Sequence, residues 1–512
     1  MGWRFGLATL VLVTIFSRLA YLGLLGDYIG ADEAVGGLMA LKISRGEDFP
    51  LVVWEAHYAG TLLSYLGAFL FLFLEPSPFI FRVTALPLAL VGITAVAAAA
   101  RALWGVGPAL AAAFWLAVGP PLLFAVSGQA IGGYPEVLAF GGLTLWLGIR
   151  FCQRLPRDGV SWEWGLLGAV GGFGTYSLAL VFPVFAGTLW ALWRHRGGLL
   201  PREWGYTAAG FFLGFSPFLL YNVTHGGASV LRLAGRVLDV STADLSHGSI
   251  LPLVMNKGIR YLLRLLWFPW AVVANLPSFL GLSRWETWAA ALAVAGGLPL
   301  ARSRRDLVRG TVPESPREKF GLALLGRCGL ATLLFVWILG LDMPRHLSPF
   351  YLLAPLGLAV LWKELAGWRR VVGWGALGLL LVSNIAGTTH EARTAEPRVA
   401  GLLNGLHSRD IKFAYTDYFI AYPLIFLSRE TILASPEAGP VNVERRPAYT
   451  EAVAASSRPA YVFRRNTEAS AVFVREMRQK GHAFRHESID EFDLYVPDRH
   501  IHPNELALLR QF

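Results

Sequence analysis

Residues Ile80 to Leu103 read IFRVTALPLALVGITAVAAAARAL, a run in which Arg82 and Arg101 are the only charged residues. A helix needs about 20 mostly apolar residues to cross a bilayer, so this run predicts a membrane-spanning helix. Of the 512 residues, 54% are hydrophobic and 16% are charged, and the mean hydropathy is +0.48. Because a soluble domain carries about 25% charged residues, the composition predicts a membrane protein and excludes a cytosolic enzyme and a disordered chain.

Other apolar runs predict further spans. They are Phe5 to Leu25, Val106 to Val126, Tyr134 to Cys152, Tyr206 to Val223, Trp285 to Ala301, Leu322 to Leu341, Leu347 to Trp362 and Val371 to Thr388. The longer stretch Trp164 to Trp193 predicts two short spans that turn near Pro183, which brings the total to about eleven transmembrane helices. Tyr58 to Leu74 and Ile259 to Leu282 are predicted to be interfacial helices.

The basic loops predict the orientation of the chain. The net charge is +10, which in a soluble protein would suggest nucleic-acid binding, but membrane proteins concentrate Lys and Arg in cytoplasmic loops. With Tyr58 to Leu74 interfacial, every arginine-rich loop, including Arg302 to Lys319, falls on one side of the membrane. We therefore expect a multi-pass cell-membrane protein with a cytoplasmic N-terminus, an extracytoplasmic C-terminus and no nucleic-acid partner.

The last part of the chain changes in character. Short apolar stretches at Phe413 to Tyr415, Tyr461 to Phe463 and Leu494 to Val496 alternate with polar helical stretches such as Ala469 to Lys480. This alternation predicts strands and helices of a small α/β domain. We expect residues 1–388 to form the transmembrane domain, with a first external loop at 26–78, and residues 389–512 to form an extracytoplasmic α/β domain.

Ionisable residues gather at the predicted outer membrane boundary. Asp32-Glu33 follows the first span, and Glu136, Arg82 and Arg345-His346 lie near the outer ends of other spans. Acidic residues also favour the first turn of any helix, so a solvated helix start explains Asp32-Glu33 equally well when it is taken alone. The additional groups favour a functional site, because ionisable residues at membrane depth are costly and usually paired or functional. Arg18 in the first span is either a cation of this network or a residue that is paired with a neighbour for purely structural reasons.

The order of these motifs resembles the GT-C glycosyltransferase superfamily, especially the bacterial branch of protein O-mannosyltransferases and aminoarabinose transferases. The matching pieces are Asp32-Glu33, Trp54 to Tyr58, Gly60-Thr-Leu-Leu-Ser-Tyr-Leu66, Phe81-Arg82-Val-Thr-Ala-Leu86, Tyr134-Pro-Glu136 and Pro344-Arg345-His346-Leu347. The resemblance implies a GT-C fold, interfacial helices in the first external loop, and an external active site supplied by a polyprenyl-phosphate sugar. The chain departs from the family at Glu136, where many members have Asp, and at His346, where Tyr is common.

The chemistry of such a transfer suggests roles for these residues. A polyprenyl phosphate is a good leaving group, so transfer needs a base for the acceptor proton and cations for the departing phosphate. The predicted catalytic residues are Asp32 as the base, with Glu33 and Glu136, the latter to position the acceptor or assist the base. The predicted substrate-binding residues are Glu55, His57, Tyr58, Arg82, Tyr134, Arg345 and His346.

Within this set, Arg345 and Arg82 would meet the phosphate, and His57 and Tyr58 would contact the sugar or the phosphate. Direct displacement with one base implies an inverting hexosyl- or pentosyltransferase. The acceptor would be a protein, a lipid or an envelope glycan. The residues predict no metal site, and the cofactor is left open, a divalent cation being one option.

Two other classes of function fit part of the sequence. A secondary transporter or lipid flippase would also have many spans and broken helices, but the chain shows no inverted repeat and its acidic groups gather at one face. A non-catalytic lipid-binding partner of an envelope assembly would tolerate the loss of Asp32. The transferase is the favoured hypothesis.

Overall fold

The computed structural model describes two compact units of the chain. Its described residues are 2–154, 162–238, 315–339, 341, 343–365 and 367–506. The helical unit comprises Met1–Leu24, His57–Gly60 and Ala85–Ala392, and the mixed unit comprises Leu25–Ala56, Thr61–Thr84 and Arg393–Phe512. Most of the predicted first external loop therefore belongs to the same compact unit as the C-terminal residues. The boundary predicted between residues 388 and 389 stays a prediction.

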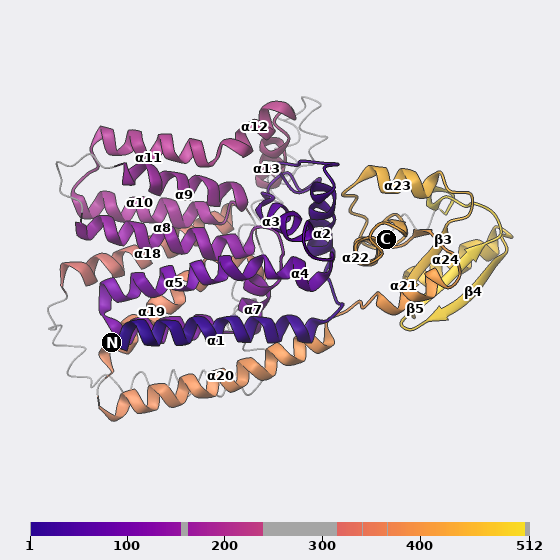
Figure 1. Ribbon diagram of the computed structural model, residues 1–512. Helices are drawn as coiled ribbons and strands as arrows, with labels where there is room; N and C mark the ends of the chain where they lie inside the picture. The colour runs from indigo at the N-terminus through magenta and orange to yellow at the C-terminus, as the bar shows by residue number, and fades with distance from the viewer. Residues whose placement is uncertain are drawn as a thin grey trace. The chain divides into compact units, whose positions relative to one another are not determined.

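Helices, most of them apolar, make up most of the described part of the helical unit, and its long helices run side by side (Figure 1). They are α1 (Gly2–Leu25), α5 (Ala85–Trp104), α6 (Val106–Ala117), α7 (Pro121–Gly128), α8 (Tyr134–Arg154), α9 (Glu163–Ser177), α10 (Val181–Arg196), α11 (Pro201–Gly214), α12 (Ser216–Thr224), α13 (Ala228–Leu238), α18 (Pro316–Ile338), the 3-10 helix η1 (Pro344–Leu347), α19 (Phe350–Glu364) and α20 (Trp368–Thr394). Large apolar side chains on their outer surfaces, such as Phe5, Phe16 and Leu213, are exposed, as expected of surfaces that face lipid.

Four described helical segments are long and apolar enough to cross a membrane: Gly2–Leu25, Pro78–Trp104, Pro316–Ile338 and Arg370–Thr394. The pair α6 and α7, which meet at an angle of 80°, makes a fifth span if the two helices are counted together. These segments confirm the predicted multi-pass membrane class. The total of eleven spans stays a prediction, since Ile259 to Leu282 and Trp285 to Ala301 lie outside the described residues.

The stretch Trp164 to Trp193 folds into two helices, as predicted, with the break a few residues before Pro183. The break falls at Leu178 to Leu180, and Pro183 lies in the first turn of α10. A proline is tolerated there because the first N–H groups of a helix have no intrahelical acceptor.

The glycines of α9 serve close helix packing. A side chain on Gly168 or Gly172 would collide with the backbone of α11 at Thr207 or Phe211, and one on Gly210 would collide with α9 at Gly165. The helices α9 and α11 therefore approach through small residues on both sides, which is a common way for membrane helices to associate.

The mixed unit combines short helices with one sheet. Its helices are α2 (Ala31–Ser44), α3 (Leu62–Phe71), α4 (Pro78–Val83), α21 (Ala400–His407), α22 (Tyr418–Leu427), α23 (Pro447–Ala454), α24 (Glu468–Gln479) and the 3-10 helix η2 (Pro503–Glu505). Its strands are β1 (Phe413–Tyr415), β2 (Leu433–Ser435), β3 (Ala460–Arg464), β4 (Phe484–Ile489) and β5 (Phe492–Pro497). The ten residues of α3 are too few to cross a bilayer.

The sheet has the strand order β2-β1-β3-β5-β4. Strand β1 is parallel to β2 and β3, whereas β5 is antiparallel to β3 and β4. The central strands β3 and β5 are almost wholly buried, and the edge strand β4 is polar and largely exposed, which limits edge-to-edge pairing with other chains. The predicted α/β domain and its three predicted strands are confirmed, and β2 and β4 are additional strands.

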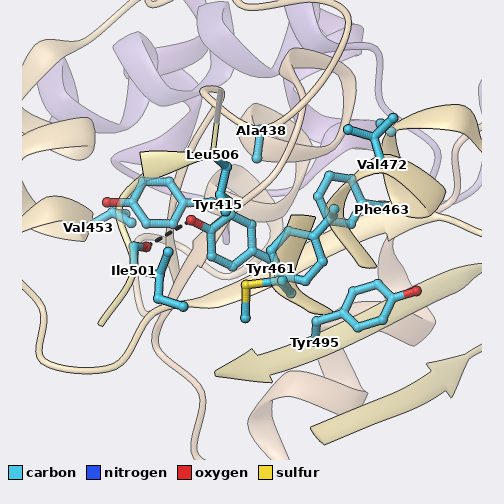
Figure 2. Close-up of a cluster of buried hydrophobic side chains, with 12 residues drawn as sticks. Tyr415, Ala438, Val453, Tyr461, Phe463, Val472, Tyr495, Ile501 and Leu506 are labelled. Carbon is cyan, nitrogen blue, oxygen red and sulfur yellow. Dashed lines mark hydrogen bonds between the residues drawn. The ribbon is translucent and has the colours of Figure 1, made fainter. Parts of the chain in front are cut away.

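One face of the sheet carries an aromatic core (Figure 2). Tyr415, Tyr461 and Tyr495 from three strands pack with residues of α23 and α24, including Val453 and Phe473. The Tyr461 hydroxyl donates a hydrogen bond to the carbonyl of Ile501 at 2.8 Å, which satisfies a polar group inside this core.

Candidate active site

The predicted acidic pair lies at the start of α2 in the mixed unit. Gly30 is the N-cap residue, and Asp32 and Glu33 occupy the first turn, where carboxylates interact favourably with the helix dipole. Neighbouring residues of a helix point in directions about 100° apart. As a result Glu33 is fully buried, whereas the side chain of Asp32 is 40% exposed.

Glu33 forms a buried ion pair with Arg82 of α4. Arg82 Nε donates to Glu33 Oε1 at 3.0 Å, and Nη2 donates to Oε2 at 2.8 Å. Both side chains have no exposed surface. The guanidinium also donates to the carbonyls of Gly26 and Tyr28, so every nitrogen of Arg82 is used within this unit. This geometry fixes the chain just before α2 and suits a positioning role for Arg82.

Asp32 contacts two residues of the C-terminal segment that the sequence analysis missed. The Tyr418 hydroxyl donates to Asp32 Oδ1 at 2.6 Å, and Arg445 Nη2 lies 3.5 Å from the same oxygen. Tyr418 is 386 residues from Asp32 in the chain, so no periodicity or local motif connects them. The available signals were only an aromatic residue at the start of an apolar helix and the basic pair Arg445-Arg446.

The segment Trp54 to Tyr58 passes from the mixed unit to the helical unit between Ala56 and His57. Glu55 and His57 both have left-handed backbone conformations, with φ of 52° and 59°. Such conformations are costly for residues with side chains and cluster at functional sites. Glu55 and Tyr58 are exposed.

In the helical unit, His57 Nδ1 lies 2.5 Å from the hydroxyl of Tyr221. Tyr221 in turn stacks on His225, with ring centroids 4.1 Å apart. The predicted substrate-binding residue His57 is therefore held by an aromatic cluster on and just after α12.

A second group of predicted residues lies in the helical unit at the start of α8. Tyr134 is the first residue of this helix, and Glu136 lies in its first turn. The guanidinium carbon of Arg345 lies 5.9 Å from the centroid of the Tyr134 ring, within the range of a cation–π contact. His346 accepts a hydrogen bond at Nδ1 from the backbone N–H of Met343 at 3.3 Å.

Glu136 is fully buried. Neither of its carboxylate oxygens has a hydrogen-bond partner among the residues that the structure describes. A buried carboxylate in this state is destabilising, and an unsatisfied buried polar group in a native structure requires an explanation. One such explanation is that the group receives a hydrogen bond from substrate.

Arg18 has a structural environment in the helical unit. Its guanidinium donates to Ser127 Oγ at 3.2 Å, to the carbonyl of Leu116 at 3.0 Å and to the carbonyl of Ala117. The guanidinium carbon also lies 3.9 Å from the centroid of the Phe124 ring. Arg18 thus binds the end of α6 at the bend before α7, which supports the structural-pairing alternative.

Comparison with known proteins identifies the fold. No protein-family model matches the chain, and no curated protein matches its sequence. The structure of ArnT from Cupriavidus metallidurans bound to undecaprenyl phosphate matches with a TM-score of 0.58 and 10% identity, over 97% of this chain and 98% of that chain. The apo state of the same protein matches with a TM-score of 0.57 and 10% identity, over 96% of this chain and 98% of that chain.

An archaeal protein has the same arrangement. The apo oligosaccharyltransferase of Archaeoglobus fulgidus matches with a TM-score of 0.53 and 12% identity, over 90% of this chain and 69% of that chain. At these identities the likeness concerns the fold. ArnT and the archaeal oligosaccharyltransferase are both GT-C proteins, so this chain has the GT-C fold that the order of its motifs predicted.

Proposed function

We propose that the protein is a membrane glycosyltransferase that moves a sugar from a polyprenyl-phosphate donor to an extracytoplasmic acceptor with inversion. The main observation behind this proposal is the difference in burial between the two acidic residues at the start of α2. Glu33 is buried against Arg82, while Asp32 stays partly exposed, in a chain with the GT-C fold. One matching structure, ArnT, is bound to undecaprenyl phosphate.

In the proposed reaction, Asp32 accepts the proton of an acceptor hydroxyl or amine. The acceptor atom forms a bond to the anomeric carbon of the sugar, and the bond between that carbon and the phosphate oxygen breaks. The polyprenyl phosphate leaves with the electron pair. Because the acceptor attacks from the face opposite the leaving group, a single displacement inverts the anomeric configuration.

The other predicted residues have supporting roles in this proposal. Glu136 positions the acceptor, and Arg345 binds the donor phosphate through its planar set of N–H groups. Glu55, His57, Tyr58, Tyr134 and His346 contact the sugar or the phosphate. Glu33 and Arg82 fix the position of Asp32, since Arg82 already donates from all three nitrogens.

A two-step experiment tests the proposed function. Lipid extracts of a strain lacking the gene are searched by mass spectrometry for a polyprenyl-phosphate sugar that accumulates relative to wild type. That lipid is then incubated in detergent with purified protein and with solubilised envelope from the deletion strain. The proposal predicts release of polyprenyl phosphate together with a glycosylated acceptor. The proposal would be contradicted if no donor lipid accumulated or if the purified protein did not convert it. A flippase would give accumulation without conversion, because a detergent solution has no membrane leaflets between which a lipid could be moved.

The proposed orientation places the N-terminus in the cytoplasm and the C-terminal domain outside. In a background without Cys152 and Cys328, an impermeant thiol reagent should label Lys412→Cys in intact cells and should not label Gly310→Cys. Lys412 is a suitable position because its side chain is 65% exposed, and Gly310 lies within the basic loop predicted to stay inside. Equal labelling of the two variants would overturn the orientation.

A further inference from the structure

The C-terminal segment holds the proposed base through a tyrosine. Tyr418 begins α22, and the side chain of Asp417 caps this helix by accepting from the backbone N–H of Ile420. The capped end directs the Tyr418 hydroxyl to Asp32 Oδ1 at 2.6 Å, a short hydrogen bond of the kind made to a charged acceptor. Burial, followed by the charge of Asp32, raises the pKa of Tyr418, so its hydroxyl keeps the proton that it donates.

Arg445 supports the same contact from a second direction. Its side chain is 11% exposed and places Nη2 3.5 Å from Asp32 Oδ1. The backbone N–H of Arg445 donates to the Tyr422 hydroxyl at 2.6 Å, and Nη1 lies 3.5 Å from the carbonyl of Trp54. Arg445 Nε also donates to the Tyr418 hydroxyl at 3.4 Å. The tyrosine and the arginine therefore hold each other as well as the carboxylate.

Chemically similar pairs in the same unit have no such relation to Asp32. The Tyr449 hydroxyl donates to Glu430 Oε1 at 2.8 Å. Arg446 lies 2.9 Å from Asp48 Oδ2, and its guanidinium carbon lies 4.8 Å from the centroid of the Trp54 ring. These two pairs supply matched controls for the contacts at Asp32.

We propose that Tyr418 and Arg445 are positioning residues for the transfer reaction, which hold the Asp32 carboxylate in the orientation that accepts the acceptor proton. This proposal rests on the proposed function, with Asp32 as the base. It makes the C-terminal domain part of the catalytic apparatus. A side chain that is fixed before the reaction loses less entropy when the reacting atoms meet.

The two contacts give the proposal a measurable consequence. Tyr418 from α22 and Arg445 from the segment before α23 contact Asp32, and the neighbouring Glu33 of α2 is paired with Arg82 of α4. Groups that orient a base act on the reaction step and not on substrate binding. Removing either contact should therefore lower kcat while KM stays close to the wild-type value.

The test compares five variants in detergent, using the polyprenyl-phosphate sugar purified from the deletion strain as donor. Tyr418→Phe and Arg445→Gln should lower kcat by about ten- to hundredfold, as expected for losing a hydrogen bond to a charged group, while KM stays close to wild type because the contacts orient the base and not the substrate. Arg445→Lys should recover part of the activity because it restores the charge. The controls Tyr449→Phe and Arg446→Gln should keep the wild-type kcat and KM, and thermal unfolding of each variant shows that it is folded.

The outcomes separate this proposal from the proposed function. If Asp32→Asn turns over at the wild-type rate, the assignment of the base fails. If Asp32→Asn is inactive but Tyr418→Phe and Arg445→Gln behave like their controls, the positioning proposal alone is wrong. A fall in kcat with no recovery by Arg445→Lys, or an equal fall in the Tyr449→Phe and Arg446→Gln controls, would also overturn it, since a purely structural role gives that pattern.

Discussion

Glu33 in the mixed unit and Glu136 in the helical unit are both fully buried in the first turn of a helix. Glu33 accepts two hydrogen bonds from one guanidinium, at 3.0 Å and 2.8 Å. Glu136 has no hydrogen-bond partner among the residues that the structure describes. The two carboxyl groups thus share burial and local helix geometry but differ in their hydrogen-bond partners within the described residues.

We propose that this difference separates a structural carboxyl group, Glu33, from a functional one, Glu136. A buried charge with an ideal partner is compatible with stability, whereas an uncompensated one lowers it. Glu136 has no hydrogen-bond partner within the described residues, and buried polar groups of this kind are typical of binding and catalytic sites. The comparison therefore predicts opposite results when each site is changed.

The largest effect is expected from Arg82→Met. This change leaves Glu33 buried without its cation, a loss of about 3–5 kcal/mol, and should lower the midpoint of thermal unfolding in detergent sharply. The double variant Glu33→Leu/Arg82→Met removes both charges and should regain most of the stability. A single variant as stable as the wild type would show that the pair is not an important structural contact.

Glu136→Gln should have the opposite pattern, with little effect on stability and a large effect on transfer. The amide has nearly the same shape as the carboxyl group and adds no charge to this buried position, so the midpoint of thermal unfolding should stay close to wild type. Transfer should fall by about a hundredfold, or about 2.7 kcal/mol in the activation barrier, because the acceptor loses its positioning contact. Destabilisation as large as that of Arg82→Met, with transfer unchanged, would indicate that Glu136 has a structural partner after all.

The smallest effect is expected at an exposed ion pair. Glu75 lies 2.8 Å from Arg429, but their side chains are 77% and 44% exposed. Solvent-exposed pairs of this kind contribute little because water competes for both partners. Glu75→Gln should leave both the unfolding midpoint and the transfer rate unchanged within error. A large loss of stability would show that exposure is a poor guide to the strength of ion pairs in this protein.

Much of the fold could be predicted from the sequence because its signals are local. The run Phe5 to Leu25 becomes α1 (Gly2–Leu25), and the three predicted strands of the C-terminal domain all form. Breaks within apolar runs were harder to predict. Thr84 separates α4 from α5, and Phe215 separates α11 from α12, yet hydropathy hardly changes at either residue.

The partners of the site residues could not be predicted for a different reason. Asp32 and Glu33 differ in burial because of what packs against α2. Arg82 lies 49 residues from Glu33, and Tyr418 lies 386 residues from Asp32. Only the tertiary fold brings such residues together. The sequence could therefore indicate the acidic pair, but not that Glu33 is buried in an ion pair while Asp32 stays partly exposed.

The most direct test of the central claim measures donor binding and transfer separately in purified Asp32→Asn. The amide keeps the shape of the side chain and loses the basic lone pair. We predict that binding of the accumulated polyprenyl-phosphate sugar stays close to wild type, while transfer falls by about a hundredfold to ten-thousandfold, the usual loss for a general base. Transfer at the wild-type rate would contradict the assignment of Asp32 as the base, and with it the proposed mechanism.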